Sequence, residues 1–422
     1  MKHGILYLCF LFAFALNAQQ SHDISIEKAR DSVKKRAFVK ALANGYFPTK
    51  YFNFDLRYLM KYNQYEAVRT GLGLETNTAF SDKYRINTYL VYGFRDTNFK
   101  YSLGAGVRVA EASNTWINAS YTDDLSETGS TQFLTDKRIF QFFEPRLLNI
   151  SLFHKHITKA ISLEHEFTPK ISTETEFSTS KIDPTYSYGF NLPDKVHTNF
   201  TTSSVKSAIQ WSPFSRFEST KTGMKETKDG YPKFTFQYTK SFKNVFKSDF
   251  NFSKFDFRTL YKIGDTKKSF SEITLVSGVS GGDTPLTHLY HAYPNNINKE
   301  TILQRFSVAG LNSFETMFFN EFFSDKFATF QFKHYLAPFN ITNRYKPQMV
   351  LITRYALGSI DQPERHQDIT FGSLDKGYTE SGFEINKLFF GFGLSFTYRY
   401  GAYHLPVMGD NVAFKFTFNV TL

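Results

Sequence analysis

Few side chains in this sequence have the types and spacing that catalysis or metal binding requires. His154 and His156 stand two residues apart and share one face of a predicted strand, and Glu164 and Glu166 do the same on the next predicted strand. Pairing of these strands would gather imidazoles and carboxylates into one cluster, which could bind a divalent metal or serve a hydrolase. No matching nucleophile motif stands near them in the sequence, so we prefer a simpler interpretation, a hydrogen-bonded network inside the protein.

A second group, Glu315, Glu321, Asp325 and His334, combines carboxylates with one imidazole. We interpret it as a set of salt bridges rather than acid–base machinery. The chain contains no His-Glu-x-x-His helix and no phosphate-cradling glycine loop. We therefore predict that the protein is not an enzyme and has no catalytic residue, no metal site and no cofactor.

Residues 1–18 have the pattern of a secretory signal peptide. A basic start precedes an apolar run over 5–16, which is too short for a spanning helix, and Ala18 supplies a small residue for cleavage. The only cysteine, Cys9, lies in this segment. The exported chain therefore lacks a thiol, which excludes disulfide bonds, zinc–thiolate sites and cysteine catalysis.

Composition is unusual for a soluble secreted protein. The chain has 49 phenylalanines and 25 tyrosines, and aromatic residues make up 18% of it, yet the mean hydropathy is negative. No window after residue 18 approaches the ~20 apolar residues of a membrane helix, so a membrane-spanning form must be a closed sheet. The net charge of +11 fits solvated loops and a polar lumen, or affinity for lipopolysaccharide and anionic lipid, and nothing indicates nucleic acid.

The C-terminal residues alternate strictly between apolar and polar side chains, as a strand with two unlike faces does. The apolar face consists of Val412, Phe414, Phe416, Phe418, Val420 and Leu422, and the other face of Ala413, Lys415, Thr417, Asn419 and Thr421. Such an apolar face must lie against a protein core or against lipid.

Fifteen further segments alternate in the same way. They are 66–77, 84–95, 99–109, 114–122, 146–157, 159–168, 171–182, 198–212, 231–243, 246–258, 268–280, 325–338, 346–358, 378–388 and 390–400. An even number of such segments, joined by short and long polar links, is typical of a transmembrane barrel. We therefore predict an all-β fold, a transmembrane antiparallel β-barrel of about 16 strands, over residues 51–422 in the bacterial outer membrane.

Two details of the pattern lead to narrower expectations. Short links, such as 97–98 and the one at Gly391, would be periplasmic turns, and long links would be extracellular loops. Phe250 and Phe252 fall on the opposite parity to the next two phenylalanines, so we expect a bulge near Ser253.

Residues 281–324 interrupt the pattern after the eleventh predicted strand. A connection this long in a compact protein is usually functional or folded inward, so we expect at least part of it to enter the lumen. The candidate residues of this lumen loop are Gly281, Gly282, Asp283, Pro285 and Asn295.

Residues 23–44 carry the only helical periodicity. Apolar residues recur at Ile26, Ala29, Val33, Ala37 and Ala41 among many basic residues, and a glycine follows the segment. We expect a periplasmic amphipathic helix and lead-in over 19–50, which could lie on the inner leaflet or partly plug the barrel. The plainer alternative is a simple periplasmic lead-in.

Several stretches resemble a known family. Tyr-Asn-Gln-Tyr-Glu-Ala-Val-Arg at 62–69, Gly-Leu-Gly-Leu-Glu-Thr-Asn at 71–77 and Tyr-Gly-Phe-Arg-Asp at 92–96 are the clearest. Together with 281–296 and 319–333, they resemble a family of uncharacterised Bacteroidota outer-membrane proteins. Its members often carry a carboxypeptidase-regulatory-like domain, absent here, ahead of a surface-antigen barrel.

This resemblance implies a barrel of the superfamily of outer-membrane assembly factors and two-partner secretion transporters. Such a barrel has sixteen strands, a long sixth extracellular loop folded into the lumen and a lateral seam between its first and last strands. The seam would be formed by Val68, Leu72, Leu74, Phe414, Phe416 and Phe418. The chain departs from the pattern in lacking the superfamily's Arg-Gly loop tip and room before residue 66 for the periplasmic domains that recruit clients.

Three functions fit these observations. We favour an assembly-factor-like barrel that aids insertion or passage of client proteins or lipids at the seam. Its partners would be outer-membrane lipid, lipopolysaccharide, and client polypeptides or assembly-machinery subunits. The alternatives are a channel or transporter for small molecules or lipids, and an enzyme in the barrel wall that would depend on His154 or His156.

Overall fold

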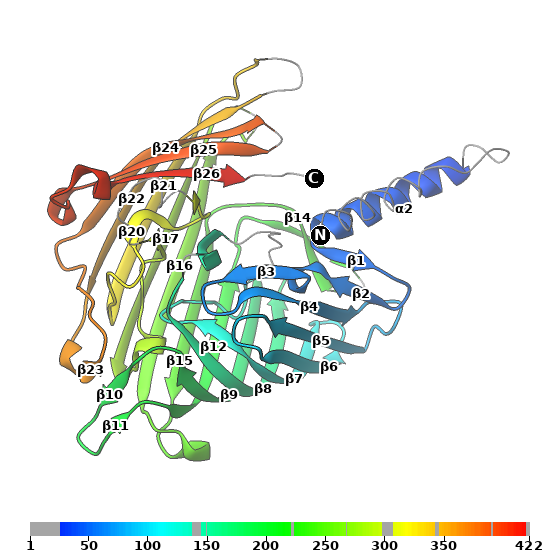
Figure 1. Cartoon of the computed structure of the whole chain (residues 1–422). Helices are drawn as coiled ribbons and strands as arrows, with labels where there is room; N and C mark the ends of the chain where they lie inside the picture. The colour runs from blue at the N-terminus through cyan, green and yellow to red at the C-terminus, as the bar shows by residue number, and fades with distance from the viewer. Residues whose placement is uncertain are drawn as a thin grey trace.

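The computed structural model describes residues 26–136, 145–148, 150–220, 223–266, 268–297, 307–341, 346–389 and 391–418. The predicted signal peptide, and Val420 and Leu422 of the terminal segment, lie outside these residues. Most of the described chain forms one large, strongly curved sheet (Figure 1). The predicted all-β class is therefore confirmed.

The long strands follow one another in chain order, and each pairs antiparallel with the next. They are β4 (Ala67–Thr76), β5 (Tyr84–Gly93), β6 (Phe99–Ala110), β7 (Thr115–Glu127), β8 (Phe153–Thr168), β9 (Ile171–Pro184), β12 (Phe200–Trp211), β15 (Lys233–Ser241), β16 (Phe252–Gly264), β17 (Phe270–Gly282), β21 (Lys326–Tyr335), β22 (Gln348–Ser359), β24 (Tyr378–Phe389), β25 (Phe392–Tyr400) and β26 (Val412–Phe418).

The smaller elements lie in the links and at the N-terminal edge. The strands are β1 (Tyr46–Pro48), β2 (Phe52–Asp55), β3 (Met60–Asn63), β10 (Gly189–Asn191), β11 (Val196–His197), β13 (Arg216–Thr220), β14 (Gly223–Lys228), β18 (Pro294–Asn296), β19 (Ser307–Val308), β20 (Phe314–Phe318) and β23 (His366–Gln367). The short helices are η2 (Leu56–Tyr58), η3 (Pro145–Leu148), η4 (Val245–Lys247), η5 (Leu286–His288), η6 (Pro363–Arg365), η7 (Gly401–Tyr403) and η8 (Met408–Asn411).

The N-terminal edge of the sheet differs from the prediction. The segment 66–77, predicted to be the first strand, is β4, and its outer edge is covered by β2 over one half and β3 over the other. The segment 52–63 therefore takes the place next to β4, and β1 pairs with part of its outer side. Alternation fails there because the Asp55 carboxylate accepts the Arg57 N–H and caps the short helix η2, which divides the strand.

The predicted division of residues 146–168 is also wrong. The segments 146–157 and 159–168 were expected to be neighbouring strands, but residues 153–168 form the single strand β8. Continuous alternation cannot reveal a turn that does not exist, and no glycine or proline interrupts this stretch. The predicted series thus contained one strand divided in two and lacked the strand at 52–63.

The two ends of the sheet do not pair with each other within the described part of the chain. β26 pairs with β25 along one edge and with the two-residue strand β19 along the other. At the opposite end, β1 pairs with β2. Figure 1 shows the N-terminal strands and β24–β26 on separate limbs of the curved sheet.

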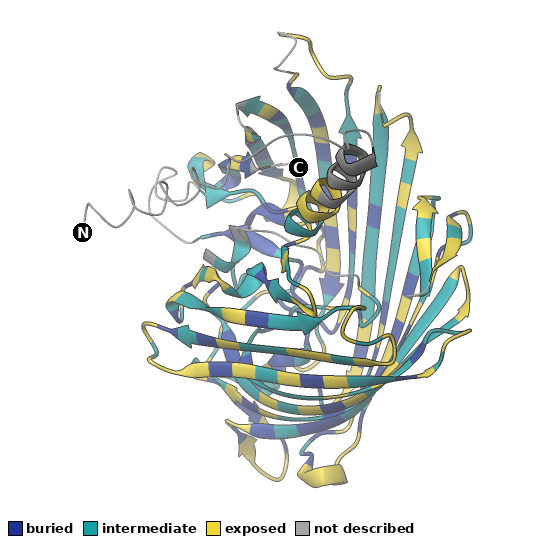
Figure 2. Ribbon diagram, turned by 90° about the vertical axis from the view of Figure 1, so that its right-hand side faces the viewer, coloured by how far each residue is buried: buried dark blue, intermediate teal, exposed yellow. Residues whose placement is uncertain are grey.

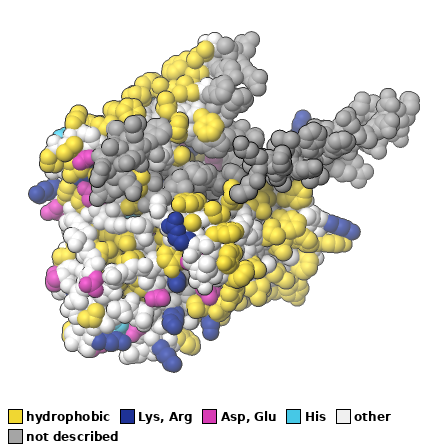
Figure 3. Space-filling model, in the orientation of Figure 1, with side chains coloured by type: hydrophobic (Ala, Val, Ile, Leu, Met, Phe, Trp, Pro, Cys, Tyr) yellow, Lys and Arg dark blue, Asp and Glu magenta, His cyan; other side chains and the backbone are white. Residues whose placement is uncertain are grey.

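The faces of the sheet are the reverse of those in a soluble protein. On β6, the side chains of Phe99 and Leu103 are 61% and 58% exposed on the outer face, whereas Lys100 and Arg108 are buried on the concave face. Figure 2 shows buried and exposed positions alternating along the strands, and Figure 3 shows broad apolar areas on the outside. The predicted alternation of this segment is confirmed.

The terminal strand repeats this pattern as far as it is described. Phe414 and Phe416 are exposed, while Ala413, Lys415 and Thr417 are buried. An apolar outer face and a polar inner face are the arrangement that a bilayer requires of a spanning sheet.

The expected bulge near Ser253 is absent, because β16 and β17 pair in continuous register from Phe252 to Gly264. Phe250 and Phe252 instead point inward and pack in a buried apolar cluster with Leu286. Phe250 and Phe252 therefore face inward because an apolar cluster that includes Leu286 lies on the concave side of the sheet.

The two short links that were assigned to one side lie at opposite ends of the sheet. Strands alternate in direction, so the link between β5 and β6 and the link between β24 and β25 cannot share an end. Longer links, including 128–152, 185–199 and 283–325, gather at the end that carries 97–98. We call this the long-link end.

The helix α2 (Ile26–Ala43) forms near its predicted position, but it is not amphipathic as expected. Its apolar residues are spread around the axis, and Phe38 and Val39 are exposed. The prediction failed because Phe38, Val39 and Leu42 fall outside the apolar stripe that the smaller residues suggested. None of the described helices is long and apolar enough to cross a membrane.

Replacing Leu103, near the middle of β6, by lysine tests whether the outer face contacts lipid. We expect Leu103→Lys to lower the free energy of unfolding in vesicles by ~2–4 kcal/mol, because a charge must enter the acyl-chain region. The control Phe80→Lys changes an exposed residue in the link after β4 and should be nearly neutral. Equal, small effects in urea titrations would contradict a lipid-facing surface.

Candidate functional site

The candidate site is the long connection between β17 and β21, which folds against the concave face of the sheet (Figure 1). We call residues 283–325 the inward loop, of which 283–297 and 307–325 are described. Several of its side chains are almost completely inaccessible to solvent, including those of Leu286, Tyr290, Asn295, Phe314, Glu315, Thr316 and Met317. Burial of a loop to this degree requires partners for its backbone and its charges.

The inward loop first folds back on itself. The backbone N–H groups of Tyr290 and Ser324 each donate to the carbonyl of the other at 2.9 Å, which closes the base of the loop. Further in, β18 and β20 pair in parallel. The loop is thus a small folded unit with hydrogen bonds of its own.

One carboxylate on the sheet binds the deepest part of the loop. Glu380 on β24 accepts the backbone N–H groups of Glu315 and Thr316 at 2.9 Å each, and the Thr316 hydroxyl at 2.6 Å. Arg354 on β22 donates to the same carboxylate at 2.7 Å, and both charged side chains are fully buried. Glu380 therefore joins two strands to the loop backbone through four hydrogen bonds.

A second ion pair joins the loop to the last strand. Lys415 on β26 lies 2.9 Å from the Glu315 carboxylate and also donates to the Asn295 carbonyl. The Asn295 amide donates to Glu315 at 2.8 Å. Burial disfavours a charged Glu315, but Lys415 and Arg354 outweigh it and hold the pKa of this carboxyl below its ordinary value.

The remaining predicted acidic residues are dispersed rather than clustered. Arg399 on β25 donates two hydrogen bonds to Glu321, at 2.7 and 3.1 Å. Asp325 accepts the Asp361 N–H at 2.7 Å, while His334 contacts Ser271 near the other end of β21. These residues act as separate anchors and do not form one acid–base group.

An aromatic residue holds the base of the loop. The Tyr290 hydroxyl donates to Asp256 on β16 at 2.7 Å, and its ring stacks on Phe327 at 4.4 Å between centroids. A Cβ added to Gly278 would lie 2.6 Å from this ring. Glycine at 278 is therefore required for Tyr290 to approach the sheet.

The predicted histidine–glutamate cluster does not form. His154, His156, Glu164 and Glu166 all belong to β8, so the two pairs are separated by about 26 Å at ~3.3 Å per residue. Within the described ranges, no group of three or more His, Cys, Asp or Glu residues is placed to hold a metal ion. The less favoured alternative, a cross-strand metal or hydrolase site, therefore has no support in the described residues, whereas His154 and His156 form hydrogen bonds with threonine hydroxyls, as the preferred interpretation expects.

A short motif in β17 also has no catalytic geometry. Residues 278–282 read Gly-Val-Ser-Gly-Gly, the letters of a nucleophile elbow, but they continue a regular strand instead of turning into a helix. The Ser280 hydroxyl donates to the Asp325 carbonyl at 3.3 Å.

The predicted lumen-loop residues divide between strand and loop. Gly281 and Gly282 end β17, and Gly282 has a positive φ of 96° where the chain turns inward. Asp283 accepts a hydrogen bond from Arg365 at 2.6 Å. Pro285 is buried at the start of η5, and Asn295 belongs to the network around Glu315.

The predicted seam residues occupy two strands that are not adjacent. Val68, Leu72 and Leu74 lie on β4, which is paired on both edges. Phe414 and Phe416 lie on β26, and the side chain of Phe418 is outside the description. Instead of an N-terminal strand, β19 of the inward loop pairs in parallel with β26, and the Ala309 N–H donates to the Phe416 carbonyl at 2.7 Å.

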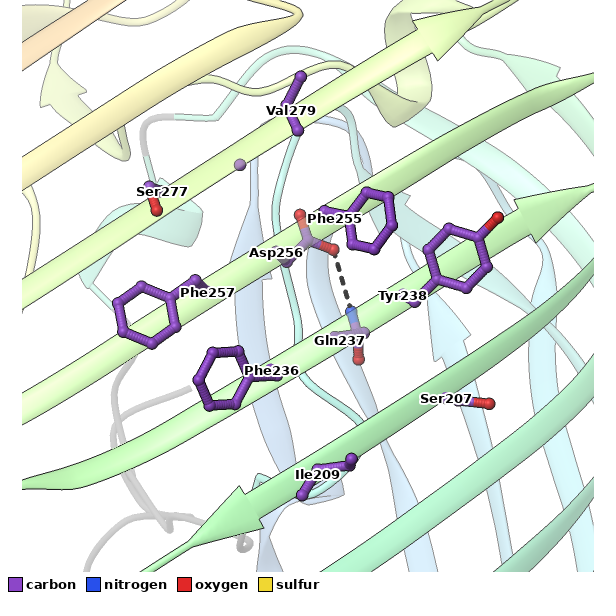
Figure 4. Close-up of a pocket in the computed structure, with 11 residues that line it drawn as sticks. Ser207, Ile209, Phe236, Gln237, Tyr238, Phe255, Asp256, Phe257, Ser277 and Val279 are labelled. Atoms are coloured by element: carbon purple, nitrogen blue, oxygen red, sulfur yellow. Dashed lines mark hydrogen bonds between the residues drawn. The ribbon is translucent and has the colours of Figure 1, made fainter.

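The outer face carries a hollow of about 530 Å³ over β12, β15, β16 and β17. Phe236, Tyr238, Phe255 and Phe257 line it, while Gln237 and Asp256 join each other through the hydrogen bond drawn in Figure 4. This surface is apolar, as the outside of a spanning sheet must be, and it provides no catalytic group.

The alternating pattern did not single out Glu380, which binds the loop backbone, or Arg354, which donates to Glu380. A signal for them exists: both occupy inward positions of neighbouring alternating segments, and they are direct partners in the ladder between β22 and β24. Opposite charges on the inner faces of adjacent strands therefore indicate where a loop is bound.

Comparisons with known proteins agree with this architecture. The structure is similar to BamA from Haemophilus ducreyi lacking POTRA domains 1–3, with a TM-score of 0.52 and 8% identity over 86% of this chain and 69% of that chain. CdiB from Acinetobacter baumannii gives a TM-score of 0.43 and 10% identity, over 84% of this chain and 57% of the CdiB chain. No curated protein matches this sequence. Residues 43–279 match the C-terminal domain of a family of unknown function, DUF5686, and the chain belongs to that family.

Proposed function

We propose that this protein is an outer-membrane β-barrel that aids the insertion or passage of client polypeptides or lipids at a seam between its first and last strands. The seam strands are the interrupted strand at 52–63 and β26. The observation that carries the proposal is that, over the described residues, β26 pairs with the inward loop and not with the N-terminal edge.

A strand edge with unpaired N–H and C=O groups is a template for another strand. Among the described residues, β19 pairs with β26 at Lys415 and Phe416. Such a short pairing can be exchanged for a longer one at little cost. A client strand, or the segment 52–63 when the barrel closes, would compete with β19 for this edge.

The outward apolar face supports a location in a bilayer, and the links support an orientation. Longer loops of outer-membrane barrels face the cell exterior, so the long-link end would be extracellular and both termini periplasmic. The helix α2 and its lead-in would then lie in the periplasm, and the lipid partners would include lipopolysaccharide on the outer side.

A channel for small molecules is the alternative function. The buried inward loop offers it less support, because its apolar clusters and its anchors to β22, β24, β25 and β26 occupy the concave side of the sheet. In our proposal the loop instead controls access to the edge of β26.

A disulfide between the loop and β26 tests the seam. Val308 and Phe416 are ladder partners, so Val308→Cys with Phe416→Cys should bridge under oxidation. We expect the oxidised protein to lose most of its ability to promote insertion of an unfolded outer-membrane β-barrel probe into vesicles, and to recover it on reduction.

The single variant Val308→Cys, treated in the same way, is the matched control. Full activity of the cross-linked protein would contradict a role for the β26 edge. An inactive wild-type protein in the same assay, together with high ion conductance in planar bilayers, would favour the channel.

Removing the Glu380 charge tests the anchor of the loop. Glu380→Gln removes the charge that pairs with buried Arg354 and weakens the acceptor of two backbone N–H groups. We expect the free energy of loop docking, or of unfolding, to fall by ~3–5 kcal/mol. Faster proteolysis of residues 307–325 and higher conductance would report release of the loop.

The control is Glu384→Gln on the same strand and face, whose carboxylate accepts one hydrogen bond from Asn386 at 3.1 Å. This variant should change the free energy of loop docking or unfolding by no more than about 1.5 kcal/mol. If the two variants behaved alike, Glu380 would not be the anchor that its geometry indicates.

A further inference from the structure

A polar cavity on the concave face is not used by the proposed function. It has a volume of 240 Å³ and lies beneath η5 of the inward loop, between β7, β8, β9, β12, β15 and β16. Its lining is rich in hydroxyl groups, contributed by Ser126, Ser130, Thr131, Thr158, Ser178, Ser180, Thr202, Ser204, Thr239 and Thr287. Hydroxyl groups both donate and accept hydrogen bonds, so they can solvate a polar ligand of either sign.

Two lysines place positive charge in this lining. Lys206 on β12 and Lys254 on β16 are both ladder partners of Thr239 on β15, on its two sides. With neighbouring strands about 4.8 Å apart, the two lysine Cα atoms are separated by roughly 10 Å, with the Thr239 hydroxyl between them. Both ammonium groups can therefore reach one small ligand above Thr239.

Lys254 is buried without a close ion pair among the described residues. Its side chain is only 7% exposed, and its ammonium lies 4.2 Å from the centre of the Tyr290 ring. No carboxylate of the described residues lies within 4.0 Å of it, and Asp256 attracts it only from a greater distance. Burial of an ammonium in this way is costly unless an anion compensates it.

The carboxylates near the cavity are mostly committed elsewhere. Asp256 accepts hydrogen bonds from Tyr290 and Gln237, at 2.7 and 3.3 Å. Glu127 forms ion pairs with Arg146 and with His291. Glu176 is the ladder partner of Lys206, and Asp256 attracts Lys254 from two positions along the same strand, but neither carboxylate forms an ion pair with its lysine within 4.0 Å among the described residues.

Three imidazoles complete the wall. His154, His156 and His288 line the cavity, and the Nδ1 of each lies within 3.2 Å of a threonine hydroxyl. Burial, and then the positive charge of Lys254, hold the pKa of His288 well below its usual range. A neutral imidazole in this position can donate a hydrogen bond to an anion.

We propose that this cavity binds a small tetrahedral oxyanion of the phosphate or sulfate class. Lys254 and Lys206 supply charge-assisted hydrogen bonds, and Thr239 and the surrounding hydroxyls supply neutral ones. The volume exceeds the ~30 Å³ of one water several-fold, which leaves room for the anion and its waters. Because η5 covers the site, the ligand is a soluble ion and not a lipid headgroup, and it ties the inward loop to β12 and β16.

Equilibrium dialysis of the detergent-solubilised full chain against radiolabelled inorganic phosphate tests the proposal. We expect saturable binding that unlabelled sulfate displaces and chloride at equal ionic strength does not. Lys254→Met should weaken binding about tenfold or more, since it removes a charge-assisted hydrogen bond. Lys206→Met should also weaken phosphate binding, because it removes the second ammonium group, which is less buried.

The matched control is Lys240→Met, which removes a lysine from the outer face of β15 and should bind phosphate as the wild type does. Hydrogen exchange gives a readout independent of affinity: phosphate should slow exchange at 286–291 in the wild type and in Lys240→Met, but not in Lys254→Met. Absence of saturable phosphate binding by the wild type, equal binding by all three lysine variants, or binding only of vesicles containing phosphatidate would overturn the proposal.

Discussion

The arrangement of the inward loop depends on one buried carboxylate. Glu380 accepts two backbone N–H groups, a hydroxyl and a guanidinium, so its acceptor sites are filled in a region that water does not reach. Glu380 is the carboxylate that is hydrogen-bonded to Arg354 among the described residues, while Glu315 and Glu384 attract the guanidinium by charge alone. Two guanidinium nitrogens of Arg354, Nε and Nη2, remain without partners in the described structure, which makes the contact with Glu380 more important.

The same requirement for pairing explains the anchors at the edge of the sheet. Lys415 and Arg399 lie on the last two strands, and each forms an ion pair with a carboxylate of the loop. The charged side chains on the inner faces of these two strands are therefore compensated by carboxylates of the loop. The pairing of β19 with β26 extends this dependence from side chains to the backbone. Loop position and strand edge are consequently coupled in this fold.

The sequence predicted the strands well wherever the two faces differ in polarity. β6 and β26 alternate between aromatic or aliphatic and polar side chains, and both appear within two residues of the expected bounds at the ends that are described. The strand at 52–63 was missed because η2 divides it, and β8 was divided because one long alternation resembles two short ones. Periodicity gives the face of each residue but not its neighbours along the sheet.

The candidate site was less predictable for the same reason. The length of the gap at 281–324 indicated an inward connection, and Asn295 and Glu315 were noticed, but their partners come from strands far away in the chain. Glu380, Arg354 and Lys415 could be recognised as inward-facing charges, yet only the fold shows which loop atoms they contact. The histidines of β8 illustrate the opposite error. Their face of the strand was predicted correctly, but β8 was divided into two strands, and this division suggested a cluster that does not exist.

Unequal strand length has a consequence for the surrounding lipid. β8 has 16 residues and is about 53 Å long, whereas β25 has 9 and is about 30 Å long, at ~3.3 Å per residue. Tilted by ~45°, β25 spans only about 21 Å, less than the ~30 Å hydrocarbon thickness of a typical bilayer. Hydrophobic mismatch would make the acyl layer thinner beside β25 than beside β8. The bilayer would then resist a polar segment least next to the edge that the inward loop covers.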